Sequence, residues 1–352
     1  MTESSTATDI IGMLGEGTPP FVIAELSGNH NGSLEKALEI VRLAARAGVD
    51  ALKLQTFTAD SMTLDMAKDD FMANPDSAWR GKKLYELYQQ ASTPRAWHGP
   101  VFDLCRELGI IAFSTPFDHD AVEFLEELDV PLYKIASFEI VDLPLIERVA
   151  ATGKPVIMST GMATLEEIDE AVQAARDNGC KDLVLLKCTS AYPAPPKDAN
   201  LRAIPLLRER YGCPVGLSDH TLGIGVAIAS VAYGASVIEK HFTDSRSEGG
   251  VDSAFSMEPE EMAQLVVEAN RAWQAAGEAH IGPVGAEHNA RNKRRSLYVI
   301  QEMKAGDPAT LENIRSIRPA RGLAPKYLKE ILGKRAVKDI ERGTPVSREL
   351  FV

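Results

Sequence analysis

The sequence has few cysteines, no long hydrophobic run and no signal-peptide pattern at its start. Four of its 352 residues are cysteines. None belongs to a Cys-x-x-Cys pair, and their apolar surroundings favour buried thiols in a reducing cytoplasm. The longest uncharged apolar stretch, 223–238, is interrupted by Gly, Ser and Tyr and is not typical of a transmembrane helix. Because the first ten residues also lack a basic start and an apolar core, we expect a cytoplasmic protein without membrane spans.

Positive charge is scarce overall and unevenly distributed. The chain has 38 Lys and Arg against 50 Asp and Glu, a net charge of −12, which argues against binding of nucleic acid or anionic membranes. Residues 286–352 carry 15 Lys and Arg against 8 Asp and Glu, so their net charge is +7 and residues 1–285 carry −19. With the Gly-Pro-Val-Gly run at 282–285, this pattern predicts a body at 1–285, a linker at 286–292 and a small module at 293–352. The alternative is a solvated basic face.

The body alternates between strand-like and helix-like segments. Most of the strand-like runs have a continuous apolar core, which is typical of strands covered on both faces in a parallel sheet. No Gly-x-Gly-x-x-Gly motif follows any of them, so a dinucleotide-binding fold lacks its main support. The eight runs span residues 21–26, 51–57, 111–117, 132–137, 155–160, 183–190, 214–220 and 236–243.

The helical segments between these runs carry recognisable start and stop signals. Residues 33–47 have apolar side chains at helical spacing, with Ser33 as a candidate N-cap and Gly48 as a candidate stop. In the segment 164–178, Thr164 and Glu167 have the spacing of a capping box. Eight βα units in about 270 residues favour an α/β fold of the (β/α)8 TIM-barrel type over an open doubly wound sheet.

The basic module is different in kind and is predicted to be a compact α+β unit with too small a core for great stability. Tight turns are expected at Lys304–Asp307 and Glu341–Thr344. The remaining segments are strands at 295–300 and 314–318, a turn or short helix at 308–314, a short helix at 325–332, and two segments at 335–340 and 346–351.

Every predicted barrel strand delivers a polar side chain at its C-terminal end. In TIM barrels the reacting groups come from these ends and from the loops that follow them. Charged residues inside strands are costly unless they are paired or used, so this pattern predicts an active site. The residues concerned include Glu25, Lys53, Gln55, Thr115, Lys134, Ser137, Ser159, Lys187, Ser190, Ser218, His220, Glu239 and His241.

Two histidines and two lysines stand out at these ends. His220 and His241 close neighbouring strands, and two imidazoles with water and substrate oxygens suit a divalent ion such as Mn²⁺ or Zn²⁺. A single histidine would more often be structural. Lys53 and Lys134, with hydroxyls from Ser137, Ser159 and Ser218, predict a pocket for phosphate and carboxylate. The alternatives are structural pairing of the lysines with Glu25 and Glu139, or a Schiff-base lysine as in class I aldolases.

An ordered set of motifs from about residue 20 onward resembles the sialic acid synthase family, and the last 60 residues resemble that family's antifreeze-like (SAF) domain. Within the family, LYELYQQASTP, the segment around Trp97-His98, GGVDSAFSM and RPARGL are most similar to the pseudaminate-forming enzymes. Enzymes that form N-acetylneuraminate or legionaminate are the nearest alternatives. The motifs are IAELSGNHNGS (23–33), LKLQTF (52–57), FSTPF (113–117), YKIAS (133–137), STGMAT (159–164), KCTSAYPAP (187–195), GLSDHT (216–221), EKHFT (239–243), RRSLYV (294–299), RPARGL (318–323) and ILGK (331–334).

The resemblance implies that phosphoenolpyruvate condenses with an open-chain amino sugar aldehyde to give phosphate and a nine-carbon 2-keto acid. It implies a divalent metal on His220 and His241, with Mn²⁺ expected and Mg²⁺ or Co²⁺ as alternatives. Glu25 becomes a candidate proton-transfer group. The implied phosphoenolpyruvate positions are Lys53, Thr115, Lys134, Ser137, Ser159, Ser190 and Ser218. The implied sugar positions are Glu25, Gln55, Glu139, Tyr192 and Asp252.

The resemblance also implies a homodimer in which the SAF domain covers the partner's barrel and contributes Arg318 to the partner's site. A different barrel enzyme, such as a Schiff-base aldolase, remains an alternative. An ice-binding role, suggested only by the name of the tail domain, needs a flat and weakly charged face, and a module with a net charge of +7 does not supply one.

Overall fold

The computed structural model describes residues 12, 17–73 and 79–352. Its internal contacts divide the chain into two compact units, Met1–Gly277 and Glu278–Val352, which are described separately below. Residues 286–292, expected as a linker, contain the short helix α12 (Glu287–Ala290) and the start of the 3-10 helix η6 (Arg291–Lys293). The boundaries placed at residues 285 and 292 from the charge pattern stay predictions.

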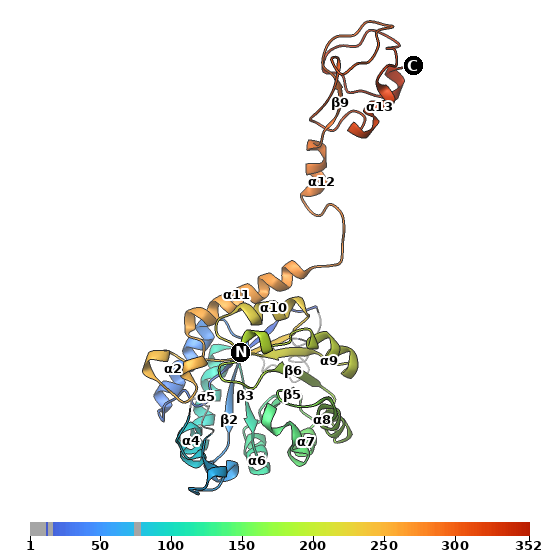
Figure 1. Ribbon diagram of the computed structural model, residues 1–352. Helices are drawn as coiled ribbons and strands as arrows, with labels where there is room; N and C mark the ends of the chain where they lie inside the picture. Colours follow the sequence, from blue (N-terminus) through green and yellow to red (C-terminus); the bar gives the residue numbers. More distant parts are fainter. Residues whose placement is uncertain (1–11, 13–16, 74–78) are drawn as a thin grey trace. The chain divides into compact units, whose positions relative to one another are not determined.

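The first unit is a closed parallel barrel whose strands follow one another in chain order, as the sequence predicted (Figure 1). The last strand pairs with the first, with Phe21 opposite Val237 and Glu25 opposite His241. All eight predicted strands are confirmed, although each is one to three residues shorter than its predicted run because residues at the ends of the runs belong to loops. The strands are β1 (Phe21–Glu25), β2 (Ala51–Thr56), β3 (Ile111–Pro116), β4 (Tyr133–Ile135), β5 (Val156–Ser159), β6 (Leu183–Cys188), β7 (Val215–Ser218) and β8 (Val237–His241).

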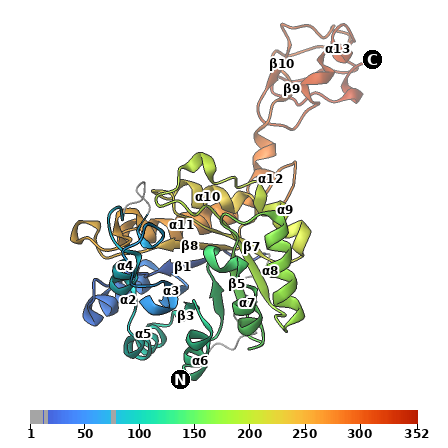
Figure 2. The same cartoon turned by 60° about the horizontal axis from the view of Figure 1, so that its bottom comes forward.

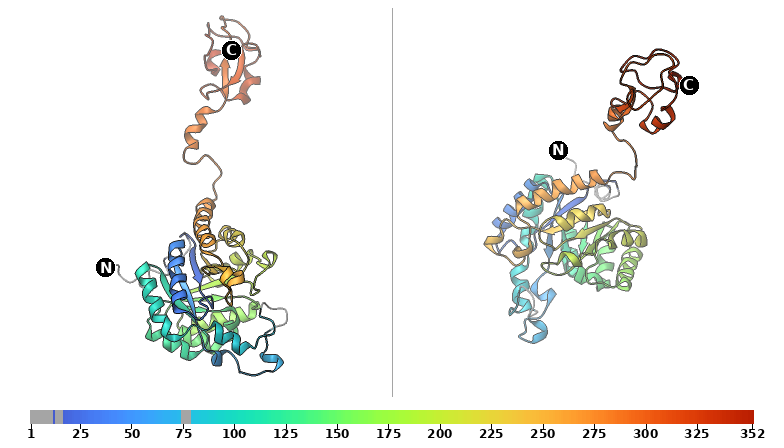
Figure 3. Two further views of the ribbon diagram at one scale, coloured as in Figure 1. Left: turned by 90° about the vertical axis from the view of Figure 1, so that its left-hand side faces the viewer. Right: turned by 45° about the horizontal axis from the view of Figure 1, so that its top comes forward.

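Helices surround the barrel strands (Figures 2 and 3). The α-helices of this unit are α2 (Leu34–Ala47), α3 (Ala59–Met62), α4 (Leu84–Ala91), α5 (Arg95–Leu108), α6 (His119–Glu127), α7 (Leu143–Ala150), α8 (Leu165–Asp177), α9 (Ala203–Tyr211), α10 (Gly225–Ala232) and α11 (Pro259–Ala276). The 3-10 helices are η1 (Asp69–Phe71), η2 (Ser137–Val141), η3 (Pro196–Asp198), η4 (Arg246–Glu248) and η5 (Ser253–Phe255). Within the described part of the chain, no helix is long and apolar enough to cross a membrane.

The predicted helix signals are confirmed at both tested positions. The Ser33 side chain accepts a hydrogen bond from the backbone N–H of Lys36, and Gly48 ends α2 with a φ of 83°, a left-handed conformation that costs glycine little. Thr164 and Glu167 form a reciprocal capping box at the start of α8. The local sequence therefore fixes where these helices begin and end.

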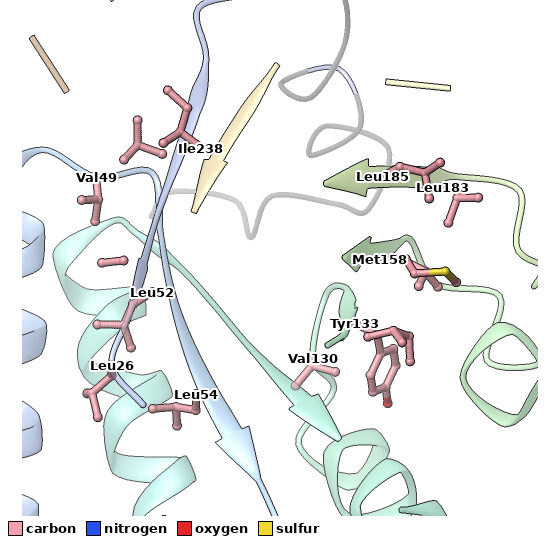
Figure 4. Packing of buried hydrophobic residues seen from close by; sticks show 14 of the residues in the cluster. Leu26, Val49, Leu52, Leu54, Val130, Tyr133, Met158, Leu183, Leu185 and Ile238 are labelled. Atoms are coloured by element: carbon pink, nitrogen blue, oxygen red, sulfur yellow. The ribbon is translucent and has the colours of Figure 1, made fainter. Parts of the chain in front are cut away.

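Two apolar layers hold the barrel together. The larger one lies between the strands and the helices, where Leu52, Tyr133, Met158, Leu185 and Ile238 pack together with helix side chains (Figure 4). Each fully buried aliphatic side chain contributes about 1.5–3 kcal/mol. A smaller cluster lies within the barrel, so that the polar strand ends form a site above a closed floor. It consists of Phe21, Ile23, Ala51, Phe113, Leu132, Ile157, Val184, Leu186 and Val237.

The second unit contains the antiparallel pair β9 (Ser296–Val299) and β10 (Ile314–Ile317), as predicted. Its short helices are η7 (Pro325–Tyr327), α13 (Leu328–Ile331) and η8 (Arg348–Leu350). The predicted turns form, since Asp307 N–H donates to Lys304 O and Thr344 N–H donates to Glu341 O. The segment 308–314 is a turn, and segments 335–340 and 346–351 are paired only through isolated bridges. The unit's core consists of Leu297, Val299, Met303, Ala309, Ile314, Ile331, Ala336, Ile340, Val346 and Phe351.

Candidate active site

The predicted site residues of the barrel unit come from the C-terminal ends of its strands and the loops that follow. Because the strands are parallel and closed into one barrel, their ends meet at a single mouth. Arg318 alone among the predicted site residues lies in the second unit, where it is exposed and follows β10. The individual roles assigned to these residues stay predictions, and the following paragraphs give their geometry.

A buried cluster of charges joins β1, β2 and β8. The Lys53 ammonium forms an ion pair with Glu25 and lies 3.9 Å from a Glu239 carboxylate oxygen. Lys53 also donates to the Thr115 hydroxyl at 3.1 Å, and the Gln55 side-chain amide donates to Glu25 at 3.0 Å. Two carboxylates and a lysine thus lie together at the mouth, at the ends of the three adjacent strands β8, β1 and β2.

Burial and the attraction between opposite charges shift the pKa values of this cluster in opposite directions. Burial raises the pKa of Glu25, even though the Lys53 charge works to lower it. At Lys53 burial works to lower the pKa, but the charges of Glu239 and Glu25 outweigh it and the pKa is raised. At Glu239 burial is likewise outweighed, by Lys53 and Lys134, and the pKa is lowered. Lys53 therefore stays cationic, and of the two carboxyl groups beside it Glu25 holds a proton more readily than Glu239.

Lys134 forms the second cationic centre. Its ammonium donates to the Ser159 hydroxyl at 2.6 Å and to the Ile135 carbonyl at 2.8 Å, and its side chain is fully buried. Burial lowers its pKa, with the nearby Lys53 charge acting in the same direction and Glu239 against it. Because the hydrogen-bond acceptors around this buried cation are neutral, its charge is not compensated by them and can bind an anion.

Hydroxyl groups from three further strand ends surround these cations. The backbone N–H of Gly161 donates to the Ser137 hydroxyl at 3.1 Å. A Cβ atom at Gly161 would lie 2.3 Å from the Ser190 hydroxyl and 2.7 Å from that of Ser137, so only glycine leaves room for both serines. The Ser218 hydroxyl donates to Glu239 at 3.1 Å. The segments that follow β4 and β6 and the last residue of β7 thus add three hydroxyls to the site.

The two histidines meet as predicted, with their ring centroids 5.3 Å apart. His220 Nδ1 lies 3.0 Å from the Thr189 carbonyl, which only accepts hydrogen bonds, so Nδ1 carries a proton and Nε2 is the ring nitrogen left for a ligand. His241 Nδ1 is buried without a hydrogen-bond partner, 3.7 Å from an Asp252 carboxylate oxygen. Burial holds the pKa of His241 well below its usual range, with the charge of His220 acting in the same direction. His241 is therefore neutral at physiological pH.

A cysteine that the sequence did not single out contacts this pair. The Cys188 sulfur lies 3.8 Å from His220 Nδ1 and 3.7 Å from the Ser190 hydroxyl. Burial works to raise the pKa of this thiol, but hydrogen bonds from His220, Ser137 and Ser190 outweigh it and bring the pKa to about 7. At His220 the same contact acts against burial and raises the imidazole pKa.

Aromatic rings cover the histidines on one side. The Tyr192 ring centroid lies 4.4 Å from that of His220 and 6.2 Å from that of His241. Phe255 contacts both Tyr192 and His241, at 5.2 and 5.1 Å between centroids. Trp79 lies 6.2 Å from Tyr192, and its indole N–H donates to the Val251 carbonyl at 2.9 Å. These rings form an apolar wall beside the polar site.

Two more carboxyl groups lie at the mouth. Asp252 is buried and accepts a hydrogen bond from Ser27, and burial raises its pKa. Glu139, on η2, has a buried oxygen without a hydrogen-bond partner, and burial raises its pKa to about 7. Both are placed to accept hydrogen bonds from a polar ligand.

The donor set fits a divalent metal with few protein ligands. Among the described residues, no group of three or more His, Cys, Asp or Glu side chains is arranged to hold a metal ion. The pair of imidazoles does offer a free Nε2 on His220 and an unpartnered buried nitrogen on His241. Such a pair suits an ion whose remaining ligands are water or substrate oxygens. The Thr189 carbonyl, which would not contact the ion itself, orients the His220 ring through its hydrogen bond to Nδ1.

Sequence reasoning left Phe255 and Cys188 out of the site, and it named Glu239 at a strand end without giving it a role. Glu239 contacts Lys53 and Ser218. It stands two residues before His241 in the same strand, so the two-residue alternation of a β-strand places both on one face and assigns Glu239 to the same site. Phe255 reaches the histidines through η5, a loop helix, and no periodic pattern in the sequence points to it.

Comparisons with known proteins match both units of the chain. Residues 40–281 match the family model described as NeuB, and residues 294–352 match the SAF domain. The chain belongs to the NeuB family. A pseudaminic acid synthase of Helicobacter pylori is 45% identical over 333 residues, covering 94% of this chain and 97% of the relative. One of Campylobacter jejuni strain 81-176 is 43% identical over 334 residues, covering 94% and 96%.

Solved structures of the NeuB family agree with the fold. The N-acetylneuraminic acid synthetase of Leptospira borgpetersenii, crystallised with citrate, superposes with a TM-score of 0.70 at 33% identity. The match covers 78% of this chain and 90% of that one. The predicted resemblance to the sialic acid synthase family is therefore confirmed, and so is the combination of a TIM barrel with a SAF domain.

Proposed function

We propose that this NeuB-family chain is a pseudaminic acid synthase, which condenses phosphoenolpyruvate with 2,4-diacetamido-2,4,6-trideoxy-altrose and water. The observation that carries the proposal is a pair of buried lysines, Lys53 and Lys134, set among hydroxyls beside two adjoining histidines. Phosphoenolpyruvate carries a phosphate and a carboxylate, and such groups are bound by buried cations with hydroxyl donors. The names of the most similar relatives support the choice of sugar.

The proposed reaction forms one carbon–carbon bond and one carbon–oxygen bond to water, and it breaks the carbon–oxygen bond to phosphate. C3 of phosphoenolpyruvate bonds to the aldehyde carbon of the sugar, and the aldehyde oxygen takes up a proton. Water then adds to the electron-poor C2 and gives up a proton. When the bond between C2 and the phosphate oxygen breaks, the hydroxyl proton left on C2 passes to the departing phosphate and the 2-keto acid remains. In this proposal Lys53 and Lys134 hold the phosphate and carboxylate and stabilise the negative charge of the departing phosphate.

Glu25 is the proposed proton-transfer group. Its pKa is raised by burial, and a carboxyl group whose pKa is raised toward the working pH is better suited to act as a general acid and base. The Gln55 amide fixes one of its oxygens at 3.0 Å, which orients the carboxyl group relative to the mouth of the barrel.

The rest of the mouth suits the proposed sugar. Asp252, Glu139 and the Tyr192 hydroxyl supply hydrogen-bonding groups for sugar hydroxyls and amide N–H groups. The sugar also has apolar parts, namely two acetamido methyl groups and a deoxy carbon. The aromatic wall of Tyr192, Phe255 and Trp79 offers a surface on which such groups can pack.

We propose that His220 and His241 hold a divalent ion, with Mn²⁺ expected and Mg²⁺ or Co²⁺ as alternatives. Bound there, the ion would polarise the sugar aldehyde as a Lewis acid. The free Nε2 of His220 and the unpartnered nitrogen of His241 support this assignment.

The test is turnover with a panel of sugars. Purified protein with phosphoenolpyruvate and Mn²⁺ is expected to release phosphate with the diacetamido trideoxy-altrose. Turnover with N-acetylmannosamine, or with the sugar precursor of legionaminate, but not with the altrose would replace the proposal by an N-acetylneuraminate or legionaminate synthase. Loss of phosphate release in a strong chelator is expected, and full activity there would refute the metal role. Covalent trapping by borohydride would instead identify a Schiff-base aldolase.

We place this activity in the cytoplasm. The four cysteines, Cys105, Cys180, Cys188 and Cys213, are all free and buried, which suits a reducing compartment. Phosphoenolpyruvate, the proposed substrate, is also made in the cytoplasm.

We further propose that the enzyme is a homodimer whose SAF domain contributes Arg318 to the partner's site. Residues 286–352, with a net charge of +7, and the strongly acidic barrel unit are electrostatically complementary. The barrel also presents an apolar surface beside its mouth, the mouth patch, formed by Phe138, Val141, Met162 and Leu165 on η2 and at the start of α8. These side chains are 46–58% exposed, and α8 packs against η2. A contiguous exposed apolar patch is typical of an interface.

Charging the mouth patch is expected to weaken the dimer. The double variant Val141→Glu/Leu165→Glu should shift the dimer–monomer equilibrium at least about tenfold toward monomer, because two carboxylates would be buried without partners. Leu165 is the first residue of α8, where a negative charge favours the helix, so folding should survive. The measurement is sedimentation equilibrium.

The matched control for the mouth patch is Leu206→Glu/Val267→Glu. These two residues lie on α9 and α11 and are 64% and 48% exposed. The control should leave the dimer unchanged. Equal dimerisation of both double variants and the unmodified protein would show that the mouth patch lies outside the interface.

A further inference from the structure

A second buried ion pair lies next to the site without belonging to it. The Lys240 ammonium is 2.7 Å from an Asp219 carboxylate oxygen, and the two side chains are 1% and 2% exposed. The pair connects the end of β8 with the loop after β7, which are neighbours in the barrel (Figure 2). None of the proposed reaction steps uses it.

Each member of this pair is the chain neighbour of one active-site histidine. Lys240 stands directly before His241, and Asp219 stands directly before His220. Since side chains of a strand alternate between its faces, Lys240 lies on the face opposite to that of Glu239 and His241. Lys240 therefore faces the helices outside the barrel rather than its interior.

The pair also fixes the residue that follows His220. The Thr221 carbonyl accepts from the Lys240 ammonium at 2.7 Å. The Thr221 backbone N–H and hydroxyl donate to the two Asp219 carboxylate oxygens, at 3.0 and 3.2 Å. His220 is thus held between two residues that are both tied to β8, the strand that carries His241.

Further backbone contacts complete the connection. The Asp219 N–H donates to the Glu239 carbonyl at 2.9 Å, and the His220 carbonyl accepts from the Ala194 N–H at 2.9 Å. Among the described residues that make these contacts, the Lys240 ammonium is the only charged side-chain group on β8 that bonds to the loop of residues 219–221.

We propose that Lys240 and Asp219 are positioning residues that set the distance and orientation of the two active-site imidazoles. A buried ion pair is a poor source of stability, because desolvation of both charges offsets their attraction. It is directional, however, and here it ties together the two segments on which a two-histidine site depends. The proposal rests on the proposed function in one respect, namely that these imidazoles are the metal ligands.

The test compares Asp219→Asn/Lys240→Met with the unmodified protein. Changing both residues avoids leaving one buried charge unpaired, and the Asn side chain can still accept from the Thr221 N–H. We expect the melting temperature to change little, while the dissociation constant for Mn²⁺ rises about ten- to a hundredfold. Mn²⁺ binding is measured by electron paramagnetic resonance, and kcat and KM for phosphoenolpyruvate are measured separately. The fall should be in kcat, since Lys53 and Lys134 are untouched.

The matched control is Lys36→Met. Lys36 forms an ion pair at 3.3 Å with Asp244, three residues after His241, and touches neither Lys240 nor Asp219. This variant should keep the Mn²⁺ affinity of the unmodified protein. A double variant that loses melting temperature but keeps Mn²⁺ affinity and kcat in its folded fraction would show that the pair is only structural.

A measurement on the metal-free protein tests the positioning role independently of the proposed function. The chain has seven histidines, and their ring signals can be followed by nuclear magnetic resonance of histidine-labelled protein. In the double variant the signals of His220 and His241 should broaden or split, while the other five stay unchanged. If the unmodified protein bound no Mn²⁺, the metal role would fail, and these signals would still decide the positioning role. Unchanged signals for both rings would overturn it.

Discussion

A Lys134→Met variant is expected to lose about a thousandfold or more in kcat/KM for phosphoenolpyruvate while remaining folded. Methionine keeps most of the side-chain volume but removes the buried ammonium, which donates to Ser159 and to the Ile135 carbonyl. Without this cation the pocket cannot offset the charge of the phosphate and carboxylate. Steady-state phosphate release and a melting curve measure the two effects.

The control for Lys134→Met is Lys154→Met. Lys154 lies in the same barrel unit and pairs with Glu126 and Asp129 on the surface, at 2.9 and 3.2 Å. Its loss should leave kcat/KM unchanged, because surface ion pairs contribute little and this one is outside the site. If Lys134→Met melted far earlier than the unmodified protein but showed normal kinetics when folded, the lysine would be structural.

Mixing two inactive variants is expected to restore activity. Arg318→Ala and His220→Ala chains should each be nearly inactive alone. When the two are co-expressed in equal amounts, random pairing gives heterodimers with one intact site and one doubly defective site, so activity should return to about a quarter of the unmodified level. The reason is the proposed arrangement, in which Arg318, exposed after β10, would act in the partner's barrel and bind sugar oxygens through its planar guanidinium.

The heterodimer must be shown to form, by purifying it through two different affinity tags. No activity in a purified heterodimer would place Arg318 in its own chain's site and refute the shared arrangement. An active Arg318→Ala homodimer would remove Arg318 from the site altogether. An Arg321→Ala chain, which changes another exposed arginine three residues away, is the matched control and should be active alone.

The barrel could be predicted from the sequence because its strands are buried on both faces. Continuous apolar runs separated by capped helices, such as the one that begins at Thr164 with its box to Glu167, leave few alternative folds. Strand ends were less well defined. The run 183–190 ends as a strand at Cys188, because the residues beyond it turn their hydroxyls and carbonyls into the mouth rather than to a neighbouring strand.

The second unit was harder to predict because its pairing is mostly irregular. Residues 335–340 and 346–351 alternate like strands, yet Ala336 and Phe351 meet only in an isolated bridge. A module of this size has a small core, and turns and single backbone bonds determine its path more than periodicity does.

The candidate site could be predicted in part. Residues inside strands, such as Lys53 and His241, were identified because charge in a buried strand is conspicuous. Glu139, Tyr192 and Asp252 entered only through the family resemblance. Phe255 and Cys188 were missed because an apolar side chain or a thiol next to a strand end looks like core. Only the fold shows that both contact the histidines.

Closure of the barrel between β1 and β8 has a consequence for synthesis of the chain. Asn29, just after β1, donates through its side-chain amide to the Phe242 carbonyl, 213 residues later. At about 5–20 residues per second, a ribosome needs on the order of 10–40 s to make the intervening chain. During that time β1 has an unpaired edge with exposed backbone N–H and C=O groups, which can pair with other nascent chains. Folding of this protein is therefore limited by the arrival of β8, and fragments that stop before it retain an open edge and are prone to aggregate.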